Sequence, residues 1–169
     1  MRAAGVILAV VAALALQTTL ARFVVRGTVA IDLVLVVVVY VALTSGPATG
    51  LLSGAIAGLV QDALSTGILG IAGLAKTIVG FVAGVIGTQF IVSQPLPRFV
   101  VFFGATIVHA IVFMGLYTVL DRIHFGNPTA GVAAQATANA LVGVVAFQVV
   151  ELLPGAVERR RAARTRLRR

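Results

Sequence analysis

Four glycines follow one another at intervals of four residues in the apolar stretch 46–87, at Gly46, Gly50, Gly54 and Gly58. In water, each glycine inside a helix costs roughly 1 kcal/mol relative to alanine, so a soluble helix of this kind would be unstable. In a lipid bilayer, small residues instead allow two helix backbones to approach closely. We therefore expect a closely packed pair of membrane helices in this stretch, with a glycine face that can take a further helix.

The composition agrees with a membrane location. Of the 169 residues, 60% are hydrophobic and only 11% are charged, whereas a soluble domain has about 25% charged residues. The length allows about six spans, because one span needs roughly 20 residues. The chain has no cysteine, which excludes disulfide bonds and thiolate chemistry. The sequence thus favours an integral membrane protein without a soluble domain large enough for a conventional active site.

Six apolar runs predict an all-α bundle of six transmembrane helices. The second run is rich in valine, but an open strand in lipid would leave backbone groups without partners, so a helix is expected there too. We place a transmembrane domain at residues 1–156 and a basic cytoplasmic tail at 157–169. The expected helices cover about residues 3–21, 29–44, 47–64, 68–92, 99–120 and 131–153.

Positive charges predict the orientation of the bundle. With six spans both termini lie on the same side, and arginine and lysine favour the cytoplasmic side. The side with the termini would hold Arg2, Arg98 and the tail, and the other side would hold only Arg22, Arg26 and Arg122. We expect the protein to lie in the plasma membrane, which is the inner membrane in cells with two membranes. Both termini are expected to be cytoplasmic.

The tail carries most of the basic charge of the chain. A solvated run of charges is one interpretation. Another is an anchor to anionic lipids, where each arginine near the surface contributes about 1 kcal/mol. Because the charge is confined to the tail, no nucleic-acid-binding face is expected. The lipid-facing residues would be Arg159, Arg160, Arg161, Arg164, Arg166, Arg168 and Arg169.

Two ionisable residues stand out in the central stretch, Asp62 and the only lysine, Lys76. Charged groups inside a span usually face the protein interior or a cavity. With a turn near residue 66, the lysine side chain could extend toward the membrane surface and reach Asp62 on the neighbouring helix. We expect an Asp62–Lys76 ion pair that holds the hairpin rigid. The alternatives for these two residues are a contact with a partner protein and the handling of a substrate or proton.

Other polar residues receive structural interpretations. Asp32 is expected to complement the dipole at the start of the second helix, and His109 to be a hydrogen-bonded packing residue. Gln135 and Asn139 are expected to form interhelical hydrogen bonds, and Glu151 to meet the tail arginines. Asp32 and Asp62 lack the neighbours typical of an intramembrane aspartyl protease. No catalytic, cofactor or metal site is predicted.

A family resemblance emerges from the order and spacing of these residues. The chain resembles the family of the rod shape-determining protein MreD. Length and the number of runs extend the likeness over essentially the whole chain, but its specific part is residues 32–84. The residues that carry it are Asp32-Leu33, Tyr40, Gly46-Pro47, Gly50, Gly54, Gly58, Gln61-Asp62, Gly67, Gly70, Leu74-Ala75-Lys76 and Gly80.

The resemblance implies a non-enzymatic scaffold of the cell-elongation machinery of walled bacteria. Its expected partner is the single-span protein MreC and, indirectly, MreB, RodA and a class B penicillin-binding transpeptidase. The family is also similar in fold to the vitamin-binding S-components of energy-coupling-factor transporters. An S-component, docked through Ala9 and Ala13, is therefore the alternative, although the loop at 63–67 is short for closing over a vitamin. A small channel or transporter acting alone is a third possibility.

Overall fold

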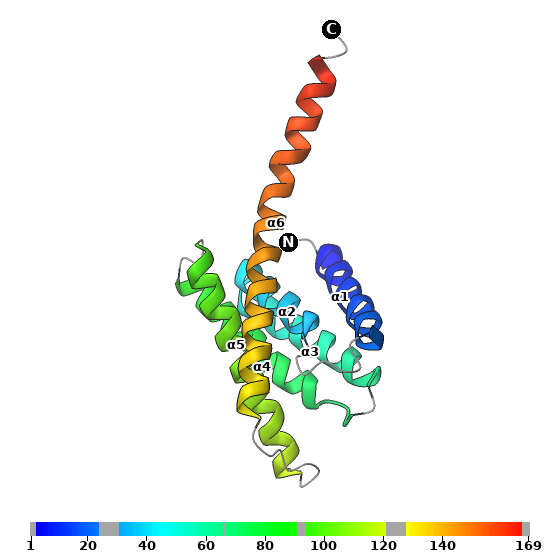
Figure 1. Ribbon diagram of the computed structural model, residues 1–169, viewed down its shortest axis with the longest axis vertical. Helices are drawn as coiled ribbons and strands as arrows, with labels where there is room; N and C mark the ends of the chain where they lie inside the picture. The colour runs from blue at the N-terminus through cyan, green and yellow to red at the C-terminus, as the bar shows by residue number, and fades with distance from the viewer. Residues whose placement is uncertain (1–2, 24–30, 66, 91–93, 121–127, 167–169) are drawn as a thin grey trace.

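The computed structural model describes residues 3–23, 31–65, 67–90, 94–120 and 128–166, and side chains within 5–19, 31–65, 67–90, 94–120 and 128–152. The described residues form six α-helices and no strand, which confirms the all-helical prediction. Figure 1 shows the bundle, with the C-terminal part of the last helix projecting beyond it. The helices are α1 (Ala3–Phe23), α2 (Leu33–Ser45), α3 (Pro47–Ala63), α4 (Ile71–Gln89), α5 (Pro95–Val119) and α6 (Thr129–Arg166).

The short, valine-rich helix α2 lies at the centre of the bundle. It contacts each of the other five helices, and Val34, Val38 and Val39 have no exposed surface. Burial on all sides explains why this helix is apolar around its whole circumference. Its first turn is capped by Asp32, whose Oδ1 accepts a hydrogen bond from the backbone N–H of Leu35 at 2.9 Å. The expected N-terminal role of Asp32 is therefore confirmed.

The glycine face of α3 is occupied by α4 of the same chain. A Cβ atom on Gly50 would lie 2.2 Å from the carbonyl oxygen of Gly80, and one on Gly54 would lie 2.2 Å from that of Lys76. A Cβ on Gly58 would lie 2.6 Å from the Cα of Gly73. These distances show two backbones in direct contact, as small residues permit in a membrane. The expected close pair is confirmed, but the face is not free for a partner's helix.

Gly46 serves a different purpose from the other three glycines. Its φ angle is +87°, a left-handed conformation that residues with a side chain rarely adopt. It ends α2 and precedes Pro47, the first residue of α3, where proline is well suited because its missing N–H would have no helical partner. Gly46 is thus a turn residue that α4 does not cover as it covers the other three glycines, and a contact of Gly46 with a partner stays a prediction.

Several helix ends differ from the expected ones. α5 begins at Pro95 and includes both Pro95 and Pro97 in its first turn, where N–H groups lack helical partners and proline is tolerated. The helix was expected to begin only near residue 99, after both prolines. α6 continues to Arg166, past residue 153, where the last helix was expected to end. The helix therefore extends beyond the predicted end near residue 153 into the segment expected to be a separate tail, whereas its apolar segment ends at Leu152, close to the predicted end of the span.

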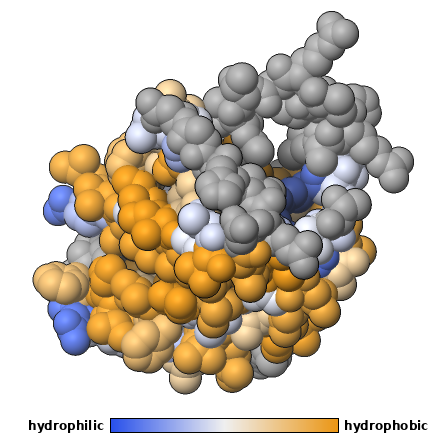
Figure 2. All heavy atoms as spheres, turned by 90° about the horizontal axis from the view of Figure 1, so that it is seen from below, coloured by the Kyte–Doolittle hydropathy of each residue, from blue (hydrophilic) through white to orange (hydrophobic). Residues whose placement is uncertain are grey.

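The surface of the bundle is apolar. Seen from the end opposite the projecting part of α6, hydrophobic residues cover most of the visible described surface (Figure 2). Among the described residues, three helices are long and apolar enough to cross a membrane, and α1 and α2 contain shorter apolar segments. The long segments are Ile71–Gln89, Pro95–Val119 and Thr129–Leu152. Six spans and the orientation of the termini remain predictions.

Candidate functional site

A buried ion pair joins α4 to the start of α2. The Nζ atom of Lys76 lies 2.7 Å from Oδ2 of Asp32, and the two side chains are only 1% and 8% exposed. Charges at such depth require a partner of opposite sign, because an isolated buried charge is very costly. The ion pair therefore fixes the start of α2 against the second turn of α4.

The ion pair belongs to a polar network that reaches two further helices. On α5, Nε2 of His109 lies 3.3 Å from Nζ of Lys76. On α6, Oδ1 of Asn139 accepts a hydrogen bond from the backbone N–H of Asp32 at 3.0 Å, and its Nδ2 donates to Thr106 at 3.2 Å. His109 and Asn139 thus have the interhelical roles expected for them. Gln135 lies beside this network, where it lines a cavity with Lys76 and His109.

Asp62 does not pair with Lys76, contrary to the sequence-based prediction. Its Oδ2 atom accepts hydrogen bonds from the backbone N–H groups of Gly70 at 2.9 Å and Gly73 at 3.1 Å. Gly70 is the N-cap of α4 and has no side chain that could accept these bonds. The carboxylate of α3 therefore takes the place of a capping side chain, at the positive end of the α4 dipole. Asp62 still links the two helices of the hairpin, but through backbone groups.

Replacing Asp62 with alanine should destabilise the α3–α4 hairpin. Loss of a capping acceptor typically costs about 0.5–2 kcal/mol. Asp62→Asn retains an acceptor oxygen and is the matched control, with a smaller expected loss. Thermal unfolding of the purified protein in detergent measures both variants. Equal losses for the two variants would show that the charge of Asp62, and not its hydrogen bonds, stabilises the hairpin.

A second ion pair lies between the first turn of α5 and the later part of α6. Arg98 donates from both terminal nitrogens to the carboxylate of Glu151, and its guanidinium lies 4.4 Å above the centre of the Phe147 ring. Arg98 is only 4% exposed. Glu151 was expected to meet the tail arginines. Among the described residues, its ion-pair partner is Arg98; the tail arginines have side chains outside the described residues, so the expected contact with them stays a prediction.

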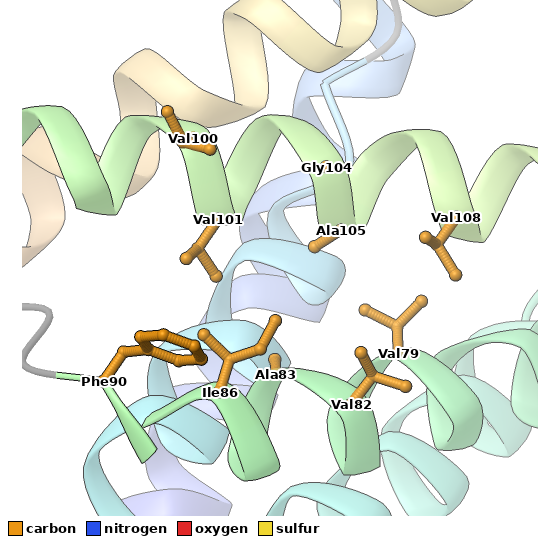
Figure 3. Close-up of a pocket in the computed structure, with 10 residues that line it drawn as sticks. All are labelled: Val79, Val82, Ala83, Ile86, Phe90, Val100, Val101, Gly104, Ala105 and Val108. Atoms are coloured by element: carbon orange, nitrogen blue, oxygen red, sulfur yellow. The ribbon is translucent and has the colours of Figure 1, made fainter. Parts of the chain in front are cut away.

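An apolar groove of about 360 Å³ runs between α4 and α5. In Figure 3, Val101, Ala105 and Val108 of α5 face Val79, Ala83 and Ile86 of α4 across this space, whereas Val100 points away from α4. A Cβ atom on Gly104 would meet nothing within 4 Å, so the backbone of α5 is accessible there. The lining residues are Val79, Val82, Ala83, Ile86, Phe90, Val100, Val101, Gly104, Ala105 and Val108. We call this space the α4–α5 groove.

A polar cavity of about 270 Å³ lies beside the ion pair of Lys76 and Asp32. It is lined by residues of five helices and by the two residues that precede α2. Glutamine side chains of α1, α3 and α6 contribute to it together with His109. The lining residues are Gln17, Ile31, Asp32, Gln61, Ala72, Lys76, His109, Ala110, Phe113, Met114 and Gln135. No group of three metal-ligating side chains occurs among the described residues.

The family of the chain follows from a match that covers nearly its whole length. Residues 2–153 match the family described as rod shape-determining protein MreD. The chain belongs to the MreD family. Comparisons with curated proteins and with solved structures found no match. Membership supports a structural role in determining rod shape, and together with the apolar helices it identifies a membrane protein.

The MreD match ends just before the arginine-rich segment. Residues 154–169 lie outside it, although the helix α6 continues to Arg166. The side chains of residues 153–169, including all seven arginines proposed to face lipid, lie outside the described residues. Arg22, Arg26 and Arg122, which served to predict the orientation, also lie outside the described side chains. Lipid binding by the tail therefore remains a prediction.

Proposed function

We propose that this MreD family member is a non-enzymatic scaffold of the bacterial cell-elongation machinery. It would bind an MreC-like single-span protein and, through that partner, would be linked to MreB, RodA and a class B penicillin-binding transpeptidase. In this way it would help to regulate peptidoglycan synthesis. The observation that carries the proposal is the family match over residues 2–153. The protein would lie in the plasma membrane, which is the inner membrane in cells with two membranes, with both termini in the cytoplasm.

The α4–α5 groove is the docking surface that the structure favours for the partner's membrane helix. Helices associate in lipid by van der Waals packing, and small residues allow the closest approach. The glycines of α3 cannot serve this purpose, because α4 covers them. In the groove, Ala83 and Ala105 provide short side chains and Gly104 has none, between larger apolar residues. A single apolar helix lying there would contact both α4 and α5.

Filling the groove should prevent the partner from binding. Gly104→Leu places a large side chain in the groove, and the open space around Gly104 allows the fold to accept it. We expect recovery of the co-expressed MreC-like protein on the purified chain to fall roughly tenfold, since about 1.4 kcal/mol of lost packing has that effect. Cells that depend on the variant should lose their rod shape.

Gly115→Leu is the matched control for this experiment. Gly115 lies on the same helix, a Cβ atom there would also meet nothing within 4 Å, and the residue does not line the groove. We expect this variant to keep both the partner and the cell shape. The proposed docking surface would be wrong if Gly104→Leu retained the partner at the level of Gly115→Leu.

A further inference from the structure

The last helix continues well beyond the part of it that is apolar enough to cross a membrane. Its apolar segment ends at Leu152, whereas α6 itself ends at Arg166. Residues 153–166 therefore extend about 21 Å further, at a rise of about 1.5 Å per residue. Figure 1 shows this segment projecting from the bundle. We call residues 153–166 the C-terminal arm.

The base of the arm is fixed by the ion pair between α5 and α6. Glu151 lies one residue before the end of the apolar segment, and both terminal nitrogens of Arg98 donate to its carboxylate. Because Arg98 belongs to the first turn of α5, this contact joins the end of the apolar segment to a neighbouring helix. α6 then continues through residues 154 and 155 without a break. The direction in which the arm leaves the bundle is therefore set by α5 and α6 together.

Distance separates most of the arm from the lipid surface. A headgroup layer is about 5–8 Å thick on each side of the hydrocarbon core, and at physiological salt charges are screened beyond about 8 Å. Arg159 lies roughly 10 Å beyond Leu152 along the helix, and Arg166 roughly 21 Å beyond it. The mean tilt of membrane helices, about 20°, shortens these distances by only about 6%. Only the first arginines of the arm are thus close enough to anionic lipids to be held by them.

The arm also lacks the apolar face with which a helix lies along a membrane. Such helices bury a stripe of large apolar residues in the headgroup layer. From Arg159 to Arg166 the sequence has five arginines, one threonine and only two apolar residues, Ala162 and Ala163, which are about 100° apart around the helix. Bending the arm onto lipid would bury almost no apolar surface and would require a break in the helix.

The positive charges of the arm repel one another. Arg164 is four residues from Arg160 and three from Arg161, and like charges at these spacings are neighbours on the helix surface and destabilise the helix. Glu158 is the single acidic residue in the sequence from 153 to 169. Carboxylates supplied by a partner would relieve this repulsion, because each can accept two parallel hydrogen bonds from one guanidinium. The arm therefore fits a negatively charged surface that stands away from the membrane.

We propose that the C-terminal arm binds an acidic surface of a protein on the side of the membrane predicted to be cytoplasmic. The partner's carboxylates follow a line of about 10 Å, the length of helix from Arg159 to Arg166. The arm lies outside the part of the chain that matches the MreD family. The inference is therefore independent of the proposed scaffold function and of the α4–α5 groove.

A label on the arm tests whether it stands away from lipid. Because the chain has no cysteine, Ala163→Cys provides a single site for a nitroxide. The full-length protein is placed in nanodiscs of phosphatidylcholine, or of equal parts of phosphatidylcholine and phosphatidylglycerol. Power-saturation EPR then measures the access of a water-soluble nickel chelate to the label. We expect the label to remain in water in both lipids. If the anionic lipid shielded it from nickel, the arm would lie on the membrane and the proposal would be wrong.

An acidic helix serves as the probe for the partner's surface. The probe is a soluble helical peptide with glutamates along one face, and its control has glutamine at the same positions. The mobility of the nitroxide at Ala163→Cys in phosphatidylcholine nanodiscs measures binding. We expect the glutamate peptide to bind at least roughly tenfold more tightly than the glutamine peptide. Equal binding of the two peptides would contradict the proposal.

Ala162→Pro, made in the labelled chain, separates a helical arm from a mere cluster of charges. It keeps every arginine but breaks the helix, so the glutamate peptide should bind roughly tenfold more weakly. Attraction to anionic lipid depends on the number of charges and should not change. Ala162→Gln keeps both the charges and the helix and should bind the peptide normally. If Ala162→Pro bound the glutamate peptide as tightly as Ala162→Gln does, the helix would not matter and the proposal would fail.

Discussion

Replacing Gly54 with alanine is expected to lower the free energy of unfolding by about 1–3 kcal/mol, the usual cost of overpacking. A Cβ atom at this position would lie 2.2 Å from the carbonyl oxygen of Lys76. Because that atom is backbone, no side-chain rotation can remove the clash, and α3 and α4 must separate. The separation would also loosen the contacts of Gly50 and Gly58 with α4, so Gly54→Leu should not fold.

Gly115→Ala is the control for this prediction. Gly115 lies on α5 with open space around it, and alanine is the better helix former by about 1 kcal/mol in water. Unfolding of both variants in the same mixed micelles measures the difference. If Gly54→Ala were as stable as Gly115→Ala, the backbones of α3 and α4 could not be as close as the structure places them.

This packing changes how a loss of partner binding should be interpreted. Substitutions on the α3 glycines would abolish partner binding simply by separating α3 from α4. Such a result would say nothing about where the partner's helix lies. Only a surface that tolerates a larger side chain, such as Gly104 in the α4–α5 groove, can separate docking from folding.

Local signals in the sequence were sufficient to predict the helices and the close hairpin. The apolar runs located six helices, and the four-residue glycine spacing indicated the α3–α4 contact. What the spacing could not say is which surface faces the glycines. In lipid a helix from the same chain and one from a partner are chemically equivalent. The glycine pattern alone therefore could not distinguish a helix of the same chain from a partner's helix. The expectation that a partner's helix packs on the glycines of α3 was wrong, because α4 packs there.

The partner of Lys76 was missed because the prediction relied on nearness in the sequence. Asp62 is 14 residues away, whereas Asp32 is separated by 44 residues. The predicted six-span topology, however, places the starts of the second and fourth helices on the same side of the membrane. Asp32 precedes the first turn of α2 and Lys76 lies in the second turn of α4. A comparison of how deep each residue lies in the membrane, predicted from the topology, would have favoured Asp32 as the partner of Lys76.

His109 and Gln61 could not have been assigned their positions from spacing alone. The rotation of α5 and α3 about their axes decides what each of them meets. The structure turns His109 toward Lys76 and leaves Oε1 of Gln61 without a partner among the described residues. Such rotations depend on the packing of the whole bundle and not on any local pattern.

Lys76→Met is expected to destabilise the protein by about 3–5 kcal/mol, the usual cost of removing one partner of a buried ion pair. Methionine fills the space of the lysine stem, so the loss comes mainly from the Asp32 carboxylate that remains buried without its cation. Asp32→Asn should have a comparable effect through the unpaired ammonium of Lys76. Asparagine is as good an N-cap as aspartate, so the cap of α2 is retained and the effect of charge is isolated.

The double variant Asp32→Asn with Lys76→Met decides whether the pair has more than a structural role. Neutral replacements of a buried pair are often no less stable than the pair itself, so the double variant should recover most of the stability lost by either single variant. A double-mutant cycle on unfolding in mixed micelles should give a coupling of at least about 2 kcal/mol. A coupling near zero would mean that Lys76 and Asp32 do not interact. If the pair serves only to join α2 to α4, cells that depend on the double variant should also remain rod-shaped, because the scaffold needs the fold and not the charges.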